Sequence, residues 1–185
     1  MMAPMQRNRP VMEALEGEYR RYQQLGEAAM AQLADAELIQ PGSGGTNSIA
    51  IIVWHLAGNF RSRFTDFLTS DGEKPDRDRD AEFEMPEQTS REQILADWDA
   101  GWAVTLASVA ALTPADLDRS ISIRGEAFLV VEALNRSITH TAYHVGQIVT
   151  LARHFAGSQW RIMSIPRRQS ARFAQGDFKT RGIAR

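Results

Sequence analysis

The chain lacks cysteine altogether, carries little net charge and contains no long apolar run. Without cysteine it can form no disulfide, thiolate metal ligand or cysteine nucleophile, so any thiol chemistry would require a thiol from outside the chain. A net charge of −2 gives no general case for binding nucleic acid or an anionic membrane. No run approaches the ~20 apolar residues of a membrane span, and the N-terminus lacks the apolar core of a signal peptide. We therefore expect a cytoplasmic protein.

The 185 residues, of which 43% are hydrophobic, suit a single domain that buries roughly two-thirds of its unfolded surface. We expect a helical bundle over about residues 10–156 and a basic C-terminal extension over residues 157–185. Residues 66–99 contain twelve acidic and four basic side chains, whereas residues 157–185 contain seven basic and one acidic. Because charge runs are usually solvated, we interpret them as an exposed loop and an exposed tail. Packing of the tail on the acidic loop is the alternative.

Apolar residues recur with helical spacing in four segments, which cover about residues 11–33, 48–69, 91–109 and 126–154. The polar stretch between the second and third segments, residues 71–89, is predicted to be a long loop. Residues 120–124 alternate between polar and apolar and are expected to be briefly extended. Four long helical patterns without a strong strand pattern predict an all-α fold, a four-helix bundle.

Capping signals support two of these helices. Thr46 or Asn47 can cap the second helix, and Ser90 with Gln93 forms a capping box for the third. The β-branched cluster at residues 49–53 could instead indicate a strand. The apolar rhythm continues well beyond this cluster, which favours a helix.

The last helical segment carries two histidines on its apolar stripe. His140 and His144 are one turn apart and therefore share a face of the helix. At about 100° per residue, the same stripe contains Val130, Ala133, Ile148, Leu151 and Phe155. Buried imidazoles need polar partners, and two imidazoles at this spacing commonly share a metal ion.

A third histidine, His55, lies in the middle of the second helical segment, on a strip with Ile51 and Ile52. A lone histidine on an apolar face is more often a hydrogen-bonded core residue than a ligand. If the two strips face each other, however, three imidazoles converge and leave a coordination position open for water or substrate, as in catalytic zinc sites. We therefore predict a metal site formed by His55, His140 and His144.

Other polar and aromatic residues give weaker signals. The fourth histidine, His154, lies about 80° away from His144 around the helix and is assigned to the last helical turn, outside the site. Trp98 and Trp102 are expected to pack in the core. Four polar side chains could orient the imidazoles or a substrate, although ordinary surface roles suit them equally: Asn59, Ser62, Ser137 and Gln147.

The chain resembles the DinB-like superfamily, also called YfiT-like, in WHLAGN around His55 and in HTAYHVGQIVTLAR around His140 and His144. It resembles an uncharacterised bacterial subfamily in RFTDFLTSDGEKPDRDRDAEFE and in the later SIPRRQS. The resemblance implies a four-helix bundle with up-down-down-up topology, often dimeric. It also implies a divalent metal ion, typically nickel or zinc, held by the three histidines. Some members of the superfamily are transferases that use bacillithiol, mycothiol or glutathione.

Two functional hypotheses follow. In the first, the protein is a metal-dependent enzyme, most concretely a transferase that uses an exogenous low-molecular-weight thiol, or a hydrolase that uses water in its place. In the second, it is a non-catalytic metal-binding or assembly protein, in which the ion mainly stabilises the core. Nucleic-acid binding by the basic tail is less favoured. The second helical segment is apolar around most of its circumference, which predicts a homodimer.

Overall fold

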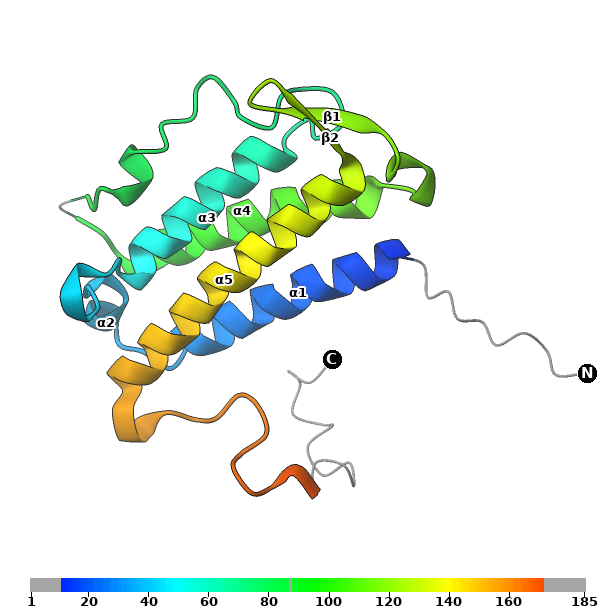
Figure 1. Cartoon of the computed structure of the whole chain (residues 1–185). Coiled ribbons are helices and arrows are strands. Elements are labelled where there is room, and N and C mark those ends of the chain that lie inside the picture. Colours follow the sequence, from blue (N-terminus) through cyan, green and yellow to red (C-terminus); the bar gives the residue numbers. More distant parts are fainter. Residues whose placement is uncertain (1–10, 87, 172–185) are drawn as a thin grey trace, which may run out of the picture.

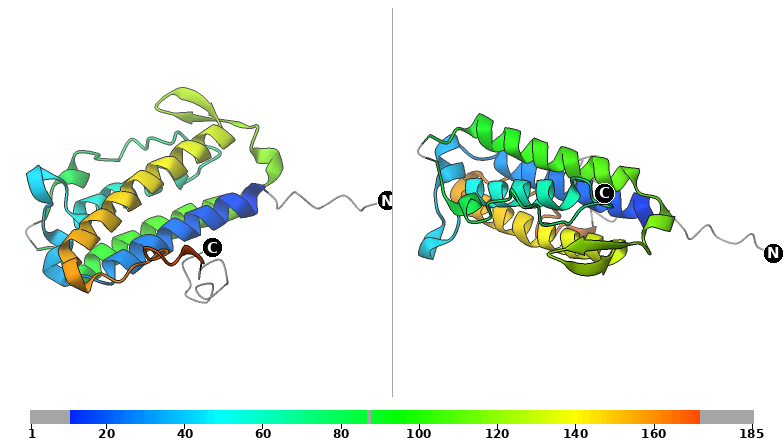
Figure 2. Two further views of the ribbon diagram at one scale, coloured as in Figure 1. Left: turned by 60° about the horizontal axis from the view of Figure 1, so that its bottom comes forward. Right: turned by 90° about the horizontal axis from the view of Figure 1, so that it is seen from above.

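The computed structural model describes residues 11–86 and 88–171 and is mainly helical, as the sequence predicts. The described residues contain four long helices: α1 (Val11–Met30), α3 (Ile49–Phe64), α4 (Arg91–Ala111) and α5 (Val130–Ala156). Helices α1 and α3 each pack against both α4 and α5, so the four helices surround one core (Figure 2). Helices α3 and α4 run in one direction, and α1 and α5 run in the opposite direction (Figure 1). Within the described part of the chain, no helix is long and apolar enough to cross a membrane.

The ends of the helices differ slightly from those expected. Helix α3 begins after Ser48, whose hydroxyl accepts a backbone hydrogen bond of 3.3 Å in the first turn, so neither predicted cap is used. It ends at Phe64 rather than near Thr69, because the chain turns at Asp66, where φ is 49°. Helix α4 is capped by the Ser90 hydroxyl, as predicted.

Shorter elements connect the long helices. They are helix α2 (Asp35–Ile39), strands β1 (Ser120–Ile123) and β2 (Glu126–Leu129), and the 3-10 turns η1 (Ser43–Gly45), η2 (Ala81–Phe83), η3 (Pro114–Asp116) and η4 (Gly157–Gln159). The predicted extended stretch is confirmed as β1, which pairs antiparallel with β2 through a turn at Arg124 and Gly125. Both turn residues have positive φ, 57° and 75°, which suits a two-residue hairpin loop. The helix expected directly after Gly125 therefore begins only at Val130. The mainly helical structure fits the all-α prediction, and the small hairpin is an addition to it.

The core contains an aromatic cluster between α1, α3 and α4. Trp98 and Trp102 are 1% and 0% exposed, which confirms that they pack in the core. The ring of Trp102 lies 4.9 Å from that of Phe60, centroid to centroid. A Cβ atom at Gly101 would lie 2.9 Å from the Cα atom of Ala57, so α3 and α4 approach closely enough to require glycine at this position.

Helix α3 is covered on several sides by its own chain. It contacts α2, α4, α5 and the η2 turn, and Val53, Phe60 and Phe64 are all buried. This burial within one chain accounts for the apolar circumference that suggested a dimer. The homodimer stays a prediction.

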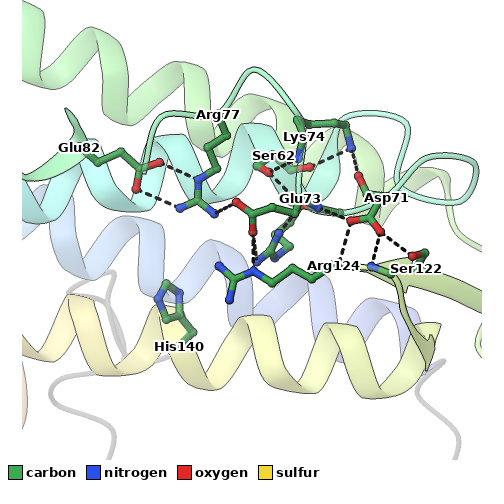
Figure 3. Close-up of polar contacts among 12 residues, drawn as sticks. Ser62, Asp71, Glu73, Lys74, Arg77, Glu82, Ser122, Arg124 and His140 are labelled. Carbon is green, nitrogen blue, oxygen red and sulfur yellow. Dashed lines mark hydrogen bonds and ion pairs between the residues drawn. The ribbon is translucent and has the colours of Figure 1, made fainter. Parts of the chain in front are cut away.

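The two helices α3 and α4 are parallel, so the chain between them must return along α3. Residues 65–86 and 88–90, here called the connecting segment, follow this path (Figure 1). Asp71 fastens the segment to the hairpin turn, because its carboxylate accepts hydrogen bonds from the Ser122 hydroxyl and from the backbone N–H groups of Arg124 (2.8 Å) and Gly125 (2.9 Å) (Figure 3). These bonds hold the pKa of Asp71 well below its usual range. The predicted long loop is therefore held to the hairpin by the hydrogen bonds of Asp71.

The basic extension is described as far as residue 171. Residues 157–171 lie beside α1, on the side of the helices away from the connecting segment (Figure 1). The backbone N–H of Arg161 donates to Gln32 Oε1 at 2.7 Å. This part of the tail does not pack on the acidic loop, and residues 172–185 lie outside the described residues.

Candidate metal centre

Helices α3 and α5 bring together the three histidines predicted as ligands. His140 Nε2 lies 3.2 Å from His55 Nε2 and 3.1 Å from His144 Nε2. One ring nitrogen from each histidine lies within 4.8 Å of the other two. His55 is 5% exposed, and all three rings border a cavity. The cluster, here called the histidine triad, forms because one turn of α5 presents two imidazoles toward the middle of α3.

Hydrogen bonds on the outer side of two rings fix their orientation. His55 Nδ1 lies 2.9 Å from Glu82 Oε2, and a carboxylate can only accept, so this nitrogen carries the hydrogen. His144 Nδ1 lies 2.8 Å from Gln147 Oε1, and the amide nitrogen of Gln147 donates to the Tyr143 hydroxyl at 3.2 Å. His144 Nδ1 is therefore also a donor. In both rings this leaves Nε2 with a lone pair that points into the triad.

The geometry of the triad fits a cation. A hydrogen on His140 Nε2 could point at only one of its two neighbours, so at least one of the two contacts of about 3 Å would have no hydrogen between its nitrogens. A shared positive ion removes this conflict. Two nitrogens that lie about 2.0–2.1 Å from one zinc ion are about 3 to 3.4 Å apart, depending on the angle at the ion. The three histidines could therefore hold one metal ion.

The surroundings of His140 and His144 lower the pKa of both side chains and so favour the neutral imidazole, the form that binds a metal ion. Burial lowers the pKa of His140 to about 3, helped by the neighbouring histidines and by the positive charges of Arg77 and Arg63. Burial also lowers the pKa of His144. Burial alone would raise the pKa of Glu82, but hydrogen bonds from His55 and Arg77 outweigh it and lower that pKa. An ionised carboxylate thus faces the donor side of His55.

The four residues that were predicted to orient the imidazoles have different contacts in the structure. Gln147 holds His144, as described above, while Asn59 and Ser137 line the cavity beside the triad. The Ser62 hydroxyl instead donates to the Gly72 carbonyl at 2.8 Å and accepts from a backbone N–H of the connecting segment. Ser62 therefore anchors the connecting segment and does not orient a histidine.

Sequence reasoning missed Glu82, which comes from the η2 turn of the connecting segment. Its side chain is 9% exposed and binds His55, while both of its oxygens accept from Arg77 at 2.7 and 2.9 Å. The Phe83 ring packs 4.9 Å from the His55 ring, centroid to centroid. Figure 3 shows Glu82 and Arg77 above His140, with Glu73 beside them. In the sequence, Glu82 is one carboxylate among several in a polar stretch. That stretch has no periodicity that would indicate which of its side chains point inward.

A cavity of about 350 Å³ opens beside the triad. Its wall includes all three histidines, apolar side chains such as Phe64, Phe67 and Ile123, and several arginines. The volume lies in the range of small-molecule sites. Among the described residues that line the cavity there is no aspartate or glutamate.

Taken together, the fold and the triad define a helical protein with a candidate metal centre at the wall of a small cavity. The chain belongs to the family described as Protein of unknown function (DUF1572), whose model matches residues 6–169. No curated protein matches the chain. The family carries no assigned activity, so function must be argued from the site.

Proposed function

We propose that this chain is a metal-dependent enzyme of the DinB-like type, in which the four long helices form an up-down-down-up bundle. Its most concrete activity is group transfer between a low-molecular-weight thiol and an electrophile. The observation that carries the proposal is the convergence of three Nε2 atoms, two of them with their Nδ1 atoms already engaged. His55, His140 and His144 would hold a divalent ion, zinc or nickel. When bound, that ion would supply Lewis acidity and lower the pKa of a thiol or water beside it.

The composition of the cavity wall favours a thiol over water as the nucleophile. A hydrolase of this kind usually uses a carboxylate as general base, and the described residues that line the cavity include none. Glu82 is the nearest carboxylate in the hydrogen-bond network, and both of its oxygens are engaged by Arg77 and His55. A thiol needs less help, because its pKa of about 8.5 is already close to neutral. The absence of cysteine from the chain means that this thiol must come from a second molecule.

The same observation supports an alternative, a metal-binding protein without catalysis. The acidic and amide groups that contact the triad, Glu82 and Gln147, serve to hold imidazoles. An ion bound by the folded state alone would then stabilise the fold by mass action. The two proposals share the metal site and differ only in whether a substrate reacts in the cavity beside it.

Untagged protein separates the proposals, because a histidine tag would bind the same ions. Elemental analysis would identify the metal, and a thiol panel with chlorodinitrobenzene would measure group transfer. His144→Ala should lose both the metal and the metal-dependent rate. His154→Ala is the matched control, because His154 is exposed on the same helix and outside the triad.

Each outcome has a clear meaning. Loss of metal and of rate in His144→Ala, with both retained in His154→Ala, supports the enzyme. Loss of metal and of thermal stability without any rate in the wild type supports the non-catalytic alternative. Equal metal content in both variants would reject the metal centre itself.

A further inference from the structure

The cavity beside the triad has a strongly basic wall. Five arginines line it, here called the arginine cluster: Arg63, Arg77, Arg79, Arg124 and Arg136. They come from α3, from the connecting segment, from the hairpin turn and from α5, so four separate parts of the chain contribute arginines to the wall of one small cavity. Like charges repel strongly at short range, and such a gathering requires counter-charges.

The carboxylates of the chain balance only part of this charge. Glu73 accepts from Arg63 at 2.9 Å, from Arg77 at 3.3 Å and from Arg124 at 3.0 Å (Figure 3). Arg77 is further paired with Glu82 at 2.7 Å. Two carboxylates thus serve three guanidinium groups, and one of these carboxylates also faces His55.

The remaining two arginines of the cluster are less well paired. Arg79 lies 4.0 Å from Asp80, whose side chain is 97% exposed, so this contact is screened by water. Within the described part of the chain, Arg136 makes no ion pair, and its guanidinium carbon lies 5.9 Å from the centre of the Phe128 ring. Arg136 is therefore an exposed arginine at the wall of the cavity, and its guanidinium has no anionic partner among the described residues.

Arg136 lies on the same face of α5 as His140 and His144. It precedes His140 by four residues on α5, and His140 precedes His144 by four. Residues at this spacing lie on one face of a helix with Cβ atoms about 5–6 Å apart. Arg136 and the three histidines line the same cavity, so one small molecule bound there could contact both.

We infer that the cavity binds a small organic anion, and that Arg136 is the residue that recognises its carboxylate or phosphate group. This inference rests on the proposed function in one respect, because it places the reacting end of the anion at the metal centre. A planar guanidinium offers two parallel N–H donors that match either oxyanion. Arg63, Arg77 and Arg124 supply positive potential and hold the connecting segment through Glu73. The volume of about 350 Å³ suits a compact acid and is too small for a polymer.

Binding of inorganic phosphate and of succinate to full-length, untagged protein tests the inference, measured by isothermal titration calorimetry. Succinamide, which has the same skeleton without charge, is the control ligand. The measurements are made on chelator-treated and on metal-loaded protein. We expect saturable binding of at least one anion in both forms, and the tighter anion identifies the preferred group.

The diagnostic variant is Arg136→Gln, and its matched control is Arg153→Gln, an exposed arginine on the same helix and away from the cavity. We expect Arg136→Gln to weaken anion binding about tenfold or more, as for loss of a charge-assisted hydrogen bond, and Arg153→Gln to leave it unchanged. Arg136→Lys keeps the charge but not the bidentate geometry and should fall between the two. It also provides the measurement if Arg136→Gln fails to fold.

The result that overturns the inference is the absence of saturable anion binding, equal weakening by both glutamine variants, or equal binding of succinamide. These failures are distinct from failure of the proposed function. Protein that binds the anion through Arg136 but takes up no metal would reject the metal-dependent enzyme alone. Protein that takes up metal but does not bind the anions would reject the anion site alone.

Discussion

Glu82 is expected to control the affinity of the histidine triad for metal, although it is not itself a predicted ligand. Its carboxylate accepts the Nδ1–H of His55 at 2.9 Å, and the side chains of Glu82 and His55 are 9% and 6% exposed. A buried carboxylate fixes the tautomer and increases the basicity of the opposite nitrogen. Glu82→Gln keeps the shape and removes the charge. We expect metal affinity to fall about 10- to 100-fold, which corresponds to about 1.4–2.7 kcal/mol.

Stability should respond to Glu82→Ala more than to Glu82→Gln. Glu82→Ala leaves the guanidinium of Arg77, which is 5% exposed, with Glu73 at 3.3 Å as its ion-pair partner. Removing one member of a buried ion pair costs about 3–5 kcal/mol. Since Glu73 still compensates Arg77 in part, we expect a loss near the lower end of that range.

A competition titration with a chromophoric chelator measures the affinity for metal, and urea denaturation measures the stability. Glu84→Gln is the control, because Glu84 is an exposed residue of the same segment. The reasoning is refuted if Glu82→Gln binds zinc and nickel as tightly as the wild type, or if Glu84→Gln loses as much affinity.

Three further predictions concern pH, packing and assembly. The pKa of His140 is lowered from 6.5 to about 3 in the folded protein, so below pH 6.5 the unfolded state binds more protons than the folded state. The melting temperature of metal-free protein should therefore fall as the pH drops from 6.5 toward 4. A melting temperature that does not depend on pH would contradict this prediction. Gly101→Ala should destabilise the fold by about 1–3 kcal/mol, because the new Cβ atom would lie 2.9 Å from the Cα atom of Ala57. Gly146→Ala, in open space on α5, should instead stabilise the fold by about 0.5–1 kcal/mol in the same denaturation assay. Light scattering should show a homodimer, and a monomer at high concentration would remove that prediction.

The helical part of the site could be predicted from the sequence because helices are periodic. The spacing of His140 and His144 places both on one face wherever the helix lies, and the apolar residues of the stripe direct that face inward. The position of His55 among isoleucines works in the same way for α3. What the periodicity could not supply was the contact between the two helices, for which the resemblance to a known bundle was needed.

The irregular part of the site could not be predicted, because tertiary contacts determine its path. The acidic run was interpreted as a solvated loop, and its Asp76, Asp78 and Asp80 are indeed exposed. Arg77 and Glu82, from the same run, are 5% and 9% exposed in their side chains. Glu82 contacts His55 and also binds Arg77. Their direction depends on the anchoring of the connecting segment by Asp71 to a hairpin. The Arg-Gly turn of that hairpin is not among the strongest sequence signals for a hairpin loop.

The charges around the triad lead to one further expectation, that metal and anion bind cooperatively. A divalent ion added beside five guanidinium groups is disfavoured by their positive potential, which Glu73 and Glu82 offset only in part. An anion held by Arg136 would lower that potential, and the ion would in turn attract the anion. Because such coupling is reciprocal, succinate should tighten zinc binding by the same factor by which zinc tightens succinate binding, about 5- to 150-fold for typical couplings. Arg136→Gln should reduce both factors together. A factor of one in the wild type, or factors that Arg136→Gln leaves unchanged, would show that the arginine cluster does not couple anion binding to the histidine triad.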